Sequence, residues 1–159
     1  PPDTEVCCNR GVNGIDGSLS TATGFALGSP RMTYALIGDL SFFYDQNALW
    51  KKSLPSNLRI LLFNNGGGGI FHVLPGLDSE HRDLYIAGSN GFSARHVAET
   101  FGLGYLSAKN AGELDAALKQ FCGTGEGKAP LLLEVFTDIE KDASATRALT
   151  AAGAGTSDR

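Results

Sequence analysis

The sequence predicts an α/β fold, with a three-layer, open and mostly parallel sheet that has helices on both faces. Apolar runs typical of buried parallel strands occur at residues 32–37, 58–63 and 130–136, and segments with helical spacing separate them. Glycine accounts for 21 of 159 residues and gathers after these runs without a collagen-like period. A chain of this length has room for one domain.

The N-terminal part is expected to contain a strand, a loop and a helix. Residues 4–8 form a short run with high β propensity, and residues 9–17 are too rich in glycine and asparagine for regular structure. Residues 18–27 are mostly small, which suits a helix that packs closely against a sheet. The buried strand at residues 32–37 would follow.

A second helix is predicted at residues 41–54. Leu49, Trp50 and Leu54 would face inward, and Pro55 is a natural stop. This helix would connect two neighbouring parallel strands.

The C-terminal half is expected to begin with a mobile loop at residues 75–92, which lack periodicity. Apolar residues then recur at helical spacing within residues 93–101. A further helix is predicted at residues 111–122, because Asn110 and Glu113 form a capping box at its start.

The domain is expected to span residues 1–141 and to be a fragment of a longer enzyme. Residues 142–159 are predicted to be a frayed or disordered tail, since they are rich in small residues and include glycines.

Composition and charge exclude several classes of function. The net charge is −4 and Lys and Arg do not cluster, so we expect no nucleic-acid partner. No apolar run approaches the ~20 residues of a membrane span. The three cysteines have neither disulfide nor metal-site spacing, which favours a reducing compartment and a cytoplasmic location. The three histidines also lack metal-site spacing, and loop or solvent-exposed roles are expected for His72, His81 and His96.

Three glycine-rich segments are expected at the carboxyl ends of strands, namely residues 9–17, 38–41 and 64–69. Open parallel sheets bind ligands at this edge. The helix that starts after Asp39 would offer N–H donors and a positive dipole to phosphate oxygens. The pattern therefore indicates a site for an anion and a counter-cation.

Asp39 and Asn65 provide the oxygen ligands for such a cation. Mg²⁺ prefers oxygen ligands and usually takes one or two protein side chains together with substrate phosphates. The glycines at residues 66–69 would allow a backbone carbonyl to join them. In the alternative interpretation, Asp39 caps its helix and Asn65 closes a turn.

A resemblance to a known family supports the metal interpretation. Gly38-Asp39-Leu40, followed after the predicted helix by Asn64-Asn65, resembles the thiamin diphosphate motif, in which Gly-Asp-Gly precedes Asn-Asn. More narrowly, the chain resembles the diphosphate-binding domain of the 2-succinyl-5-enolpyruvyl-6-hydroxy-3-cyclohexene-1-carboxylate synthases of menaquinone biosynthesis. The likeness spans roughly residues 4–140 and depends on residues 9–17, 38–41, 44–49, 64–71 and 74–75. Leu40 departs from the superfamily glycine, but leucine is common in this family.

The resemblance implies a Mg²⁺ (or Mn²⁺) site formed by Asp39, the side chain of Asn65 and the carbonyl oxygen of Gly67. Ten residues would bind thiamin diphosphate: Gly14, Ile15, Gly38, Asp39, Leu40, Ser41, Asn65, Gly67, Gly68 and Ile70. The N–H groups of Leu40 and Ser41 would meet the diphosphate.

Three residues are expected to take part in catalysis, namely Arg10, Ile15 and Phe71. Ile15 would support the bent cofactor. Arg10 would hold a substrate carboxylate, which a guanidinium binds in a bidentate manner, although a surface ion pair is the alternative. Phe71 would line an apolar side of the pocket with Ile70 and Leu74, or else belong to the core.

The implied transferase reaction decarboxylates 2-oxoglutarate and adds the succinyl carbanion equivalent to isochorismate. In this superfamily the activating glutamate belongs to a separate N-terminal domain, usually of a second subunit. We therefore expect a homo-oligomeric full-length enzyme, in which this chain contacts the rest of its own polypeptide and a partner subunit. The isolated chain is expected to be inactive.

Two alternatives remain open at this point. An acetolactate-synthase-like enzyme or a 2-keto acid decarboxylase would share the metal motif. A non-catalytic nucleotide-binding α/β module would use the same strand ends for a nucleotide phosphate. Standard nucleotide motifs are absent, since Ala129 stands where a phosphate loop at residues 123–129 would have Ser or Thr, and residues 102–107 lack a third glycine.

Overall fold

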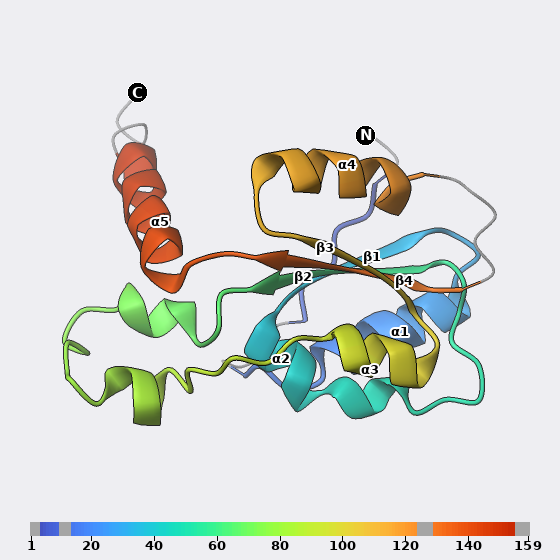
Figure 1. Cartoon of the computed structure of the whole chain (residues 1–159), viewed down its shortest axis with the longest axis horizontal. Coiled ribbons are helices and arrows are strands. Elements are labelled where there is room, and N and C mark those ends of the chain that lie inside the picture. Colours follow the sequence, from blue (N-terminus) through green and yellow to red (C-terminus); the bar gives the residue numbers. More distant parts are fainter. Residues whose placement is uncertain (1–3, 10–13, 124–128, 155–159) are drawn as a thin grey trace.

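The computed structural model describes residues 4–9, 14–123 and 129–154, and these contain one four-stranded sheet. Its strands are β1 (Thr33–Gly38), β2 (Leu58–Asn64), β3 (Gly104–Ala108) and β4 (Leu131–Phe136). They lie in the order β1-β2-β4-β3, and each neighbouring pair is parallel (Figure 1). The predicted α/β class is confirmed, and the described sheet is parallel throughout.

Helices and helical turns connect the strands. The α-helices are α1 (Ser18–Gly28), α2 (Asp39–Tyr44), α3 (Arg95–Phe101), α4 (Ala111–Phe121) and α5 (Ile139–Ala154). Shorter turns are the 3₁₀ helices η1 (Gln46–Leu49) and η2 (Gly69–His72) and the π-helical turn η3 (Arg82–Ile86). None of the helices in the described residues combines the length and the hydropathy that a membrane span requires.

The helices form two layers around the sheet. Figure 1 shows α1, α2 and α3 on one face and α4 on the other. The larger hydrophobic cluster includes Leu19 of α1, Phe42 of α2 and Ile60 of β2, all fully buried. A smaller cluster joins Phe121 of α4 to Leu133 of β4. Each buried apolar side chain contributes ~1.5–3 kcal/mol, so these clusters hold the three layers together.

The face that carries α4 is covered over only part of its width. Helix α4 packs on β3 and β4. On β1, by contrast, buried and exposed residues alternate, and Leu36 is 68% exposed. Tyr34 of β1 and Phe63 of β2 are 45% and 42% exposed. The strand predicted at residues 32–37 is therefore present, but it is buried on one face only.

Two of the strand predictions are wrong. Residues 4–9 are described, and they form no strand. The fourth strand is instead β3, which the sequence pattern does not predict. Its residues are half-buried except for the fully buried Ala108, so it lacks the continuous apolar run of a central strand. Its place at the end of the sheet explains this composition.

The helix predicted at residues 41–54 is shorter than expected. It starts at Asp39, ends at Tyr44 and is followed by η1. Asp45 interrupts it, because its carboxylate accepts hydrogen bonds of 2.6 Å from both the N–H and the hydroxyl of Ser20 in α1. Leu49 is fully buried as predicted, whereas Trp50 is 73% exposed and does not face inward.

The C-terminal segment differs from the predicted frayed tail, because α5 continues to Ala154. Ala143 is 1% exposed, and Asp142 accepts a hydrogen bond of 2.6 Å from the Thr137 hydroxyl. Arg147 donates a hydrogen bond of 2.8 Å to the carbonyl of His72. These contacts combine with the high helix propensity of alanine to order a segment whose composition predicted disorder.

The predicted capping box at the start of α4 gives a test of the fold. The Asn110 side chain accepts a hydrogen bond of 3.0 Å from the Glu113 N–H. We expect Asn110→Ala to lower the free energy of unfolding by about 1 kcal/mol, because a helix N–H loses its partner. Urea titration measures the change. The control is Gln120→Ala on the exposed side of the same helix, and an equal loss in both variants would contradict the capping role.

Candidate functional site

Asp39 lies at the carboxyl edge of the sheet, directly after β1 and at the start of α2. It is 2% exposed. Its Oδ1 accepts a hydrogen bond of 2.7 Å from the Leu40 N–H, whereas the buried Oδ2 has no hydrogen-bond partner among the residues that the structure describes. An unpaired buried carboxylate oxygen is costly, and a bound cation would satisfy it.

The surroundings of Asp39 change its acidity. Burial raises the pKa of the carboxyl above its ordinary value of 3.8. The backbone N–H groups of Leu40, Gly66 and Gly67 lower this pKa in part, but burial outweighs them. The glycine-rich loop after β2 therefore lies next to the Asp39 carboxylate. A divalent cation at Oδ2 would favour the ionised carboxylate and so lower the pKa that burial raises.

Asn65 directly follows β2 and lies at the same edge of the sheet as Asp39. Its amide oxygen accepts a hydrogen bond of 3.3 Å from the Gly67 N–H, and its amide nitrogen donates one of 3.2 Å to Asp142 of α5. The Gly67 N–H thus lies beside both the Asn65 oxygen and the Asp39 carboxylate. The structure brings together the two side chains predicted as metal ligands.

The glycine loop is held by a second segment of chain. The Gly68 N–H donates a hydrogen bond of 2.6 Å to the carbonyl of Ala87, and the Asn90 N–H donates one of 2.7 Å to the carbonyl of Gly66. Gly66 has a φ of +80°, and a Cβ at Gly67 would lie 3.1 Å from the Ala87 oxygen. Larger residues would strain this loop. Glycine is needed here because the loop packs directly against the backbone of residues 87–90.

Asn64 has a different role from its neighbour. Its amide nitrogen donates a hydrogen bond of 2.7 Å to the fully buried Glu134, and its amide oxygen accepts one of 3.1 Å from the Gly66 N–H. Glu134 also accepts hydrogen bonds from the hydroxyls of Ser93 and Tyr105. Burial and the Glu134 hydrogen bond raise the pKa of Tyr105. Asn64 therefore fixes the start of the loop, a role that sequence reasoning missed.

The start of α2 is joined to the first glycine-rich segment. The Ser41 hydroxyl donates a hydrogen bond of 2.5 Å to the carbonyl of Ile15, which is 46% exposed. A Cβ at Gly14 would lie 2.7 Å from a carboxylate oxygen of Asp16. The Leu40 N–H, predicted as a diphosphate donor, is hydrogen-bonded to the Asp39 side chain in this structure.

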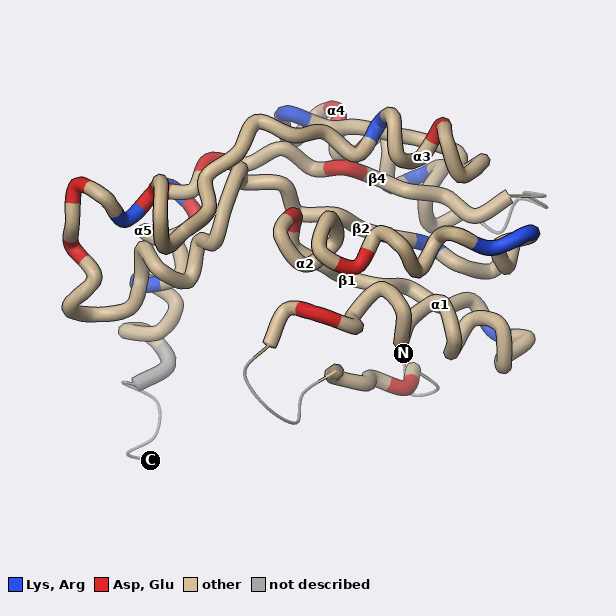
Figure 2. The backbone as a smooth tube through the Cα atoms, turned by 90° about the horizontal axis from the view of Figure 1, so that it is seen from below, with Lys and Arg blue, Asp and Glu red and all other residues tan. Residues whose placement is uncertain are grey.

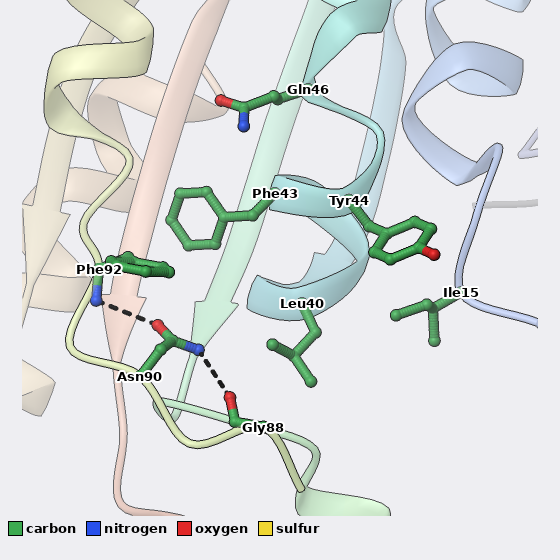
Figure 3. Close-up of a pocket in the computed structure, with 8 residues that line it drawn as sticks. All are labelled: Ile15, Leu40, Phe43, Tyr44, Gln46, Gly88, Asn90 and Phe92. Atoms are coloured by element: carbon green, nitrogen blue, oxygen red, sulfur yellow. Dashed lines mark hydrogen bonds between the residues drawn. The ribbon is translucent and has the colours of Figure 1, made fainter. Parts of the chain in front are cut away.

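An apolar groove of about 450 Å³ opens beside α2 (Figure 3). It is lined by Ile15, Leu40, Phe43, Tyr44, Gln46, Gly88, Asn90 and Phe92. Figure 3 shows that these residues come from the first glycine-rich segment, from α2 and its continuation, and from the segment that holds the glycine loop. Two predicted cofactor-binding residues, Ile15 and Leu40, therefore share one groove.

Sequence reasoning missed most of this lining. Phe43 and Tyr44 lie three and four positions after Leu40, and this helical spacing could have placed them on the same side. Phe92 comes from the segment predicted to be a mobile loop, yet its ring contacts that of Phe43 with 5.7 Å between centroids. No pattern within that segment indicates the contact.

Other predicted site residues lie elsewhere. Ile70 is 62% exposed and Leu74 is 46% exposed, and neither they nor Phe71 line the groove. The Phe71 ring packs instead at Gly68, where a Cβ would lie 2.8 Å from it. The roles of these residues in binding stay predictions. Arg10, predicted to hold a substrate carboxylate, lies outside the described residues.

Comparison with known proteins identifies the domain. The family model described as thiamine pyrophosphate enzyme, C-terminal TPP binding domain, matches residues 3–135. The chain belongs to this thiamin-diphosphate-binding domain family. Its members bind thiamin diphosphate, which agrees with the cofactor predicted from residues 38–40 and 64–65.

Relatives of the thiamin-diphosphate-binding domain include several 2-succinyl-5-enolpyruvyl-6-hydroxy-3-cyclohexene-1-carboxylate synthases. The domain is 49% identical to the synthase of Phocaeicola vulgatus over 92% of this chain and 27% of the relative. It is 51% identical to that of Bacteroides thetaiotaomicron over 90% of this chain and 26% of the relative. It is 44% identical to the synthase of Desulfotalea psychrophila over 84% of this chain and 24% of the relative. The chain spans about a quarter of the length of these relatives.

His72 of the thiamin-diphosphate-binding domain is not in the exposed or loop role that the sequence predicts. It is 6% exposed, and its two ring nitrogens lie 2.9 Å from Asp83 and 2.8 Å from Glu140. Arg82 also contacts both carboxylates. Figure 2 shows acidic and basic residues close together where α5 begins. This cluster joins η2, η3 and α5, and it stabilises the chain that follows the glycine loop.

The described residues contain no metal centre built from several His, Cys, Asp or Glu side chains. In the described ranges, no three or more His, Cys, Asp or Glu residues are grouped so that they could hold a metal ion. The predicted ligand set contains one carboxylate, one carboxamide and one backbone carbonyl, so it is of another type.

The raised pKa of Asp39 predicts how the stability of the metal-free domain depends on pH. The folded state retains the proton to higher pH than the unfolded state, so the Asp39 contribution to stability falls as pH rises above 3.8. We expect the difference in unfolding free energy between the unchanged chain and Asp39→Ala to fall as the pH rises above about 4. Urea titrations with a chelator measure it. A difference that rises with pH would contradict the burial argument.

Proposed function

We propose that this chain is the diphosphate- and Mg²⁺-binding domain of a thiamin-diphosphate-dependent synthase. The observation that carries the proposal is the buried, unpaired Oδ2 of Asp39 beside Asn65 and Gly67 at the carboxyl edge of a parallel sheet. Carboxylate, carboxamide and carbonyl oxygens suit Mg²⁺, which takes further ligands from phosphate groups. The residues present therefore fit a metal ion of the kind that binds phosphate groups, as the family implies.

Each part of the site has a distinct task in this proposal. Asp39, Asn65 and the Gly67 carbonyl would hold the metal ion, while Ile15 and Leu40 would contact the apolar part of the cofactor. Thiamin diphosphate, when bound, supplies the carbanion chemistry for decarboxylation and carbon–carbon bond formation. Fixing one end of a cofactor orients its other end, and such positioning can contribute several kcal/mol to catalysis.

For the whole enzyme, we propose the reaction named by the relatives. The support is an identity of 49–51% to two synthases over at least 90% of this chain. The substrates would be 2-oxoglutarate and isochorismate, and the pathway menaquinone biosynthesis. The proposal includes a second subunit that completes the active site, a homo-oligomer and a cytoplasmic location.

Calorimetry with the full-length protein that carries this sequence tests the cofactor site. We expect thiamin diphosphate with Mg²⁺ to bind and ATP with Mg²⁺ to bind at least about 10-fold more weakly. Asp39→Ala should weaken thiamin diphosphate binding by more than about 10-fold, because it removes a metal ligand. Asp115→Ala, at an exposed position of α4, is the control. Tighter binding of ATP would favour the nucleotide-binding alternative instead.

A comparison of keto acids tests the proposed role of Arg10. We expect the full-length enzyme to decarboxylate 2-oxoglutarate in preference to pyruvate, because the Arg10 guanidinium would pair with the second carboxylate of 2-oxoglutarate, which pyruvate lacks. Arg10→Ala should reduce kcat/KM for 2-oxoglutarate by roughly 10-fold or more, with a smaller effect from Arg10→Lys. Arg95→Ala in α3 serves as the control. A preference for pyruvate in the unchanged enzyme would instead favour an acetolactate-synthase-like or decarboxylase activity.

A further inference from the structure

The proposed metal site needs Asn65 in one orientation. A carboxamide has two unlike ends, and only its oxygen can bind a cation. Rotation about the last side-chain bond would exchange the ends and present an NH₂ group to the metal ion. Another group must therefore distinguish the two ends if Asn65 is to serve reliably as a ligand.

Asp142 of α5 contacts one end of the Asn65 carboxamide. Its Oδ2 lies 3.2 Å from the amide nitrogen of Asn65. An ionised carboxylate only accepts hydrogen bonds, so it attracts the NH₂ end and repels the oxygen. At the other end, the Asn65 oxygen accepts a hydrogen bond from the Gly67 N–H, beside Asp39. Both contacts favour the same orientation.

The Asp142 carboxylate is itself held in place. Its Oδ2 accepts a hydrogen bond of 2.6 Å from the Thr137 hydroxyl. The Thr137 N–H donates one of 2.9 Å to the carbonyl of Asn64, which ties Thr137 to the end of β2. The absence of a side chain at Gly69 leaves room for the amide, since a Cβ there would lie 2.8 Å from its nitrogen.

From this geometry, we propose that Asp142 is a positioning residue that turns the Asn65 carboxamide so that its oxygen faces the metal ion. The inference is conditional on the proposed function. It makes α5 a part of the cofactor site. Groups that orient a metal ligand typically change metal affinity by ~10–100-fold when they are removed.

The test measures Mn²⁺ affinity in the full-length protein that carries this sequence, at saturating thiamin diphosphate. Electron paramagnetic resonance of free Mn²⁺ reports binding without any need for activity, and a protein-free blank removes binding by the cofactor alone. We expect Asp142→Ala to weaken Mn²⁺ binding by about 10-fold or more. Thr146→Ala is the matched control, because its hydroxyl donates a hydrogen bond of 2.8 Å to the backbone carbonyl of Asp142 in the same helix.

A second background separates orientation from a general structural or charge effect. In Asn65→Asp both ends of the side chain are oxygens, so no orienting group is required. We expect the added Asp142→Ala change to leave Mn²⁺ affinity equal or tighter in that background, since it also removes the repulsion between two carboxylates. If Asp142→Ala weakened Mn²⁺ binding both with Asn65 and with Asn65→Asp, the inference would be overturned. The loss would then come from a general structural or charge effect and not from orientation of the amide.

The remaining outcomes also decide the question. Equal Mn²⁺ affinity of the unchanged protein and Asp142→Ala, within about twofold, would overturn the inference and leave the proposed function intact. A lack of saturable Mn²⁺ binding by the unchanged protein would refute the proposed function itself. If circular dichroism shows that Asp142→Ala does not fold, Asp142→Asn replaces it. We then expect a smaller loss of at least about threefold, which again disappears with Asn65→Asp.

Discussion

The buried carboxylate of Asp39 has one oxygen without a hydrogen-bond partner in the described structure, and the organisation of the site depends on it. Burial outweighs the nearby N–H groups, so in the absence of a cation this group opposes folding when ionised. The parallel strands set it at the sheet edge, and the glycine loop brings Gly66 and Gly67 beside it. Residues 87–90 hold that loop by backbone hydrogen bonds. The fold thus bears a local cost that a bound cation would remove.

Much of this arrangement could be predicted from the sequence because it follows from local order along the chain. The apolar runs of β2 and β4 are short and continuous, which is typical of buried parallel strands. Parallel strands end at one edge, so Asp39 after β1 and Asn65 after β2 had to be neighbours once the connection between them was helical. The cap of α4 was equally predictable, since its partners are only three residues apart.

What could not be predicted depends on partners far away in the sequence. Asn65 meets Asp142 across 77 positions, and Asn64 meets Glu134 across 70. Composition alone predicted a frayed tail at residues 142–159, because it contains no information about the contacts that order α5 as far as Ala154. The strand β3 has too little apolar character to be recognised, and residues 4–8 have the composition of a strand but form none. In each case a tertiary contact, or its absence, overrides the local signal.

The pairing register of β1 and β2 limits how this domain can vary in length. Gly38 pairs with Phe63, so Asp39 follows at the level of Asn64, one position before Asn65. Loss or gain of one residue within either strand would shift its end by ~3.3 Å and turn its last side chain to the opposite face. Insertions and deletions should instead collect between Trp50 and Asn57. This segment connects η1 to the start of β2, at the edge of the sheet opposite to Asp39. Natural length variation is therefore expected to spare the strands and to be found in that connection.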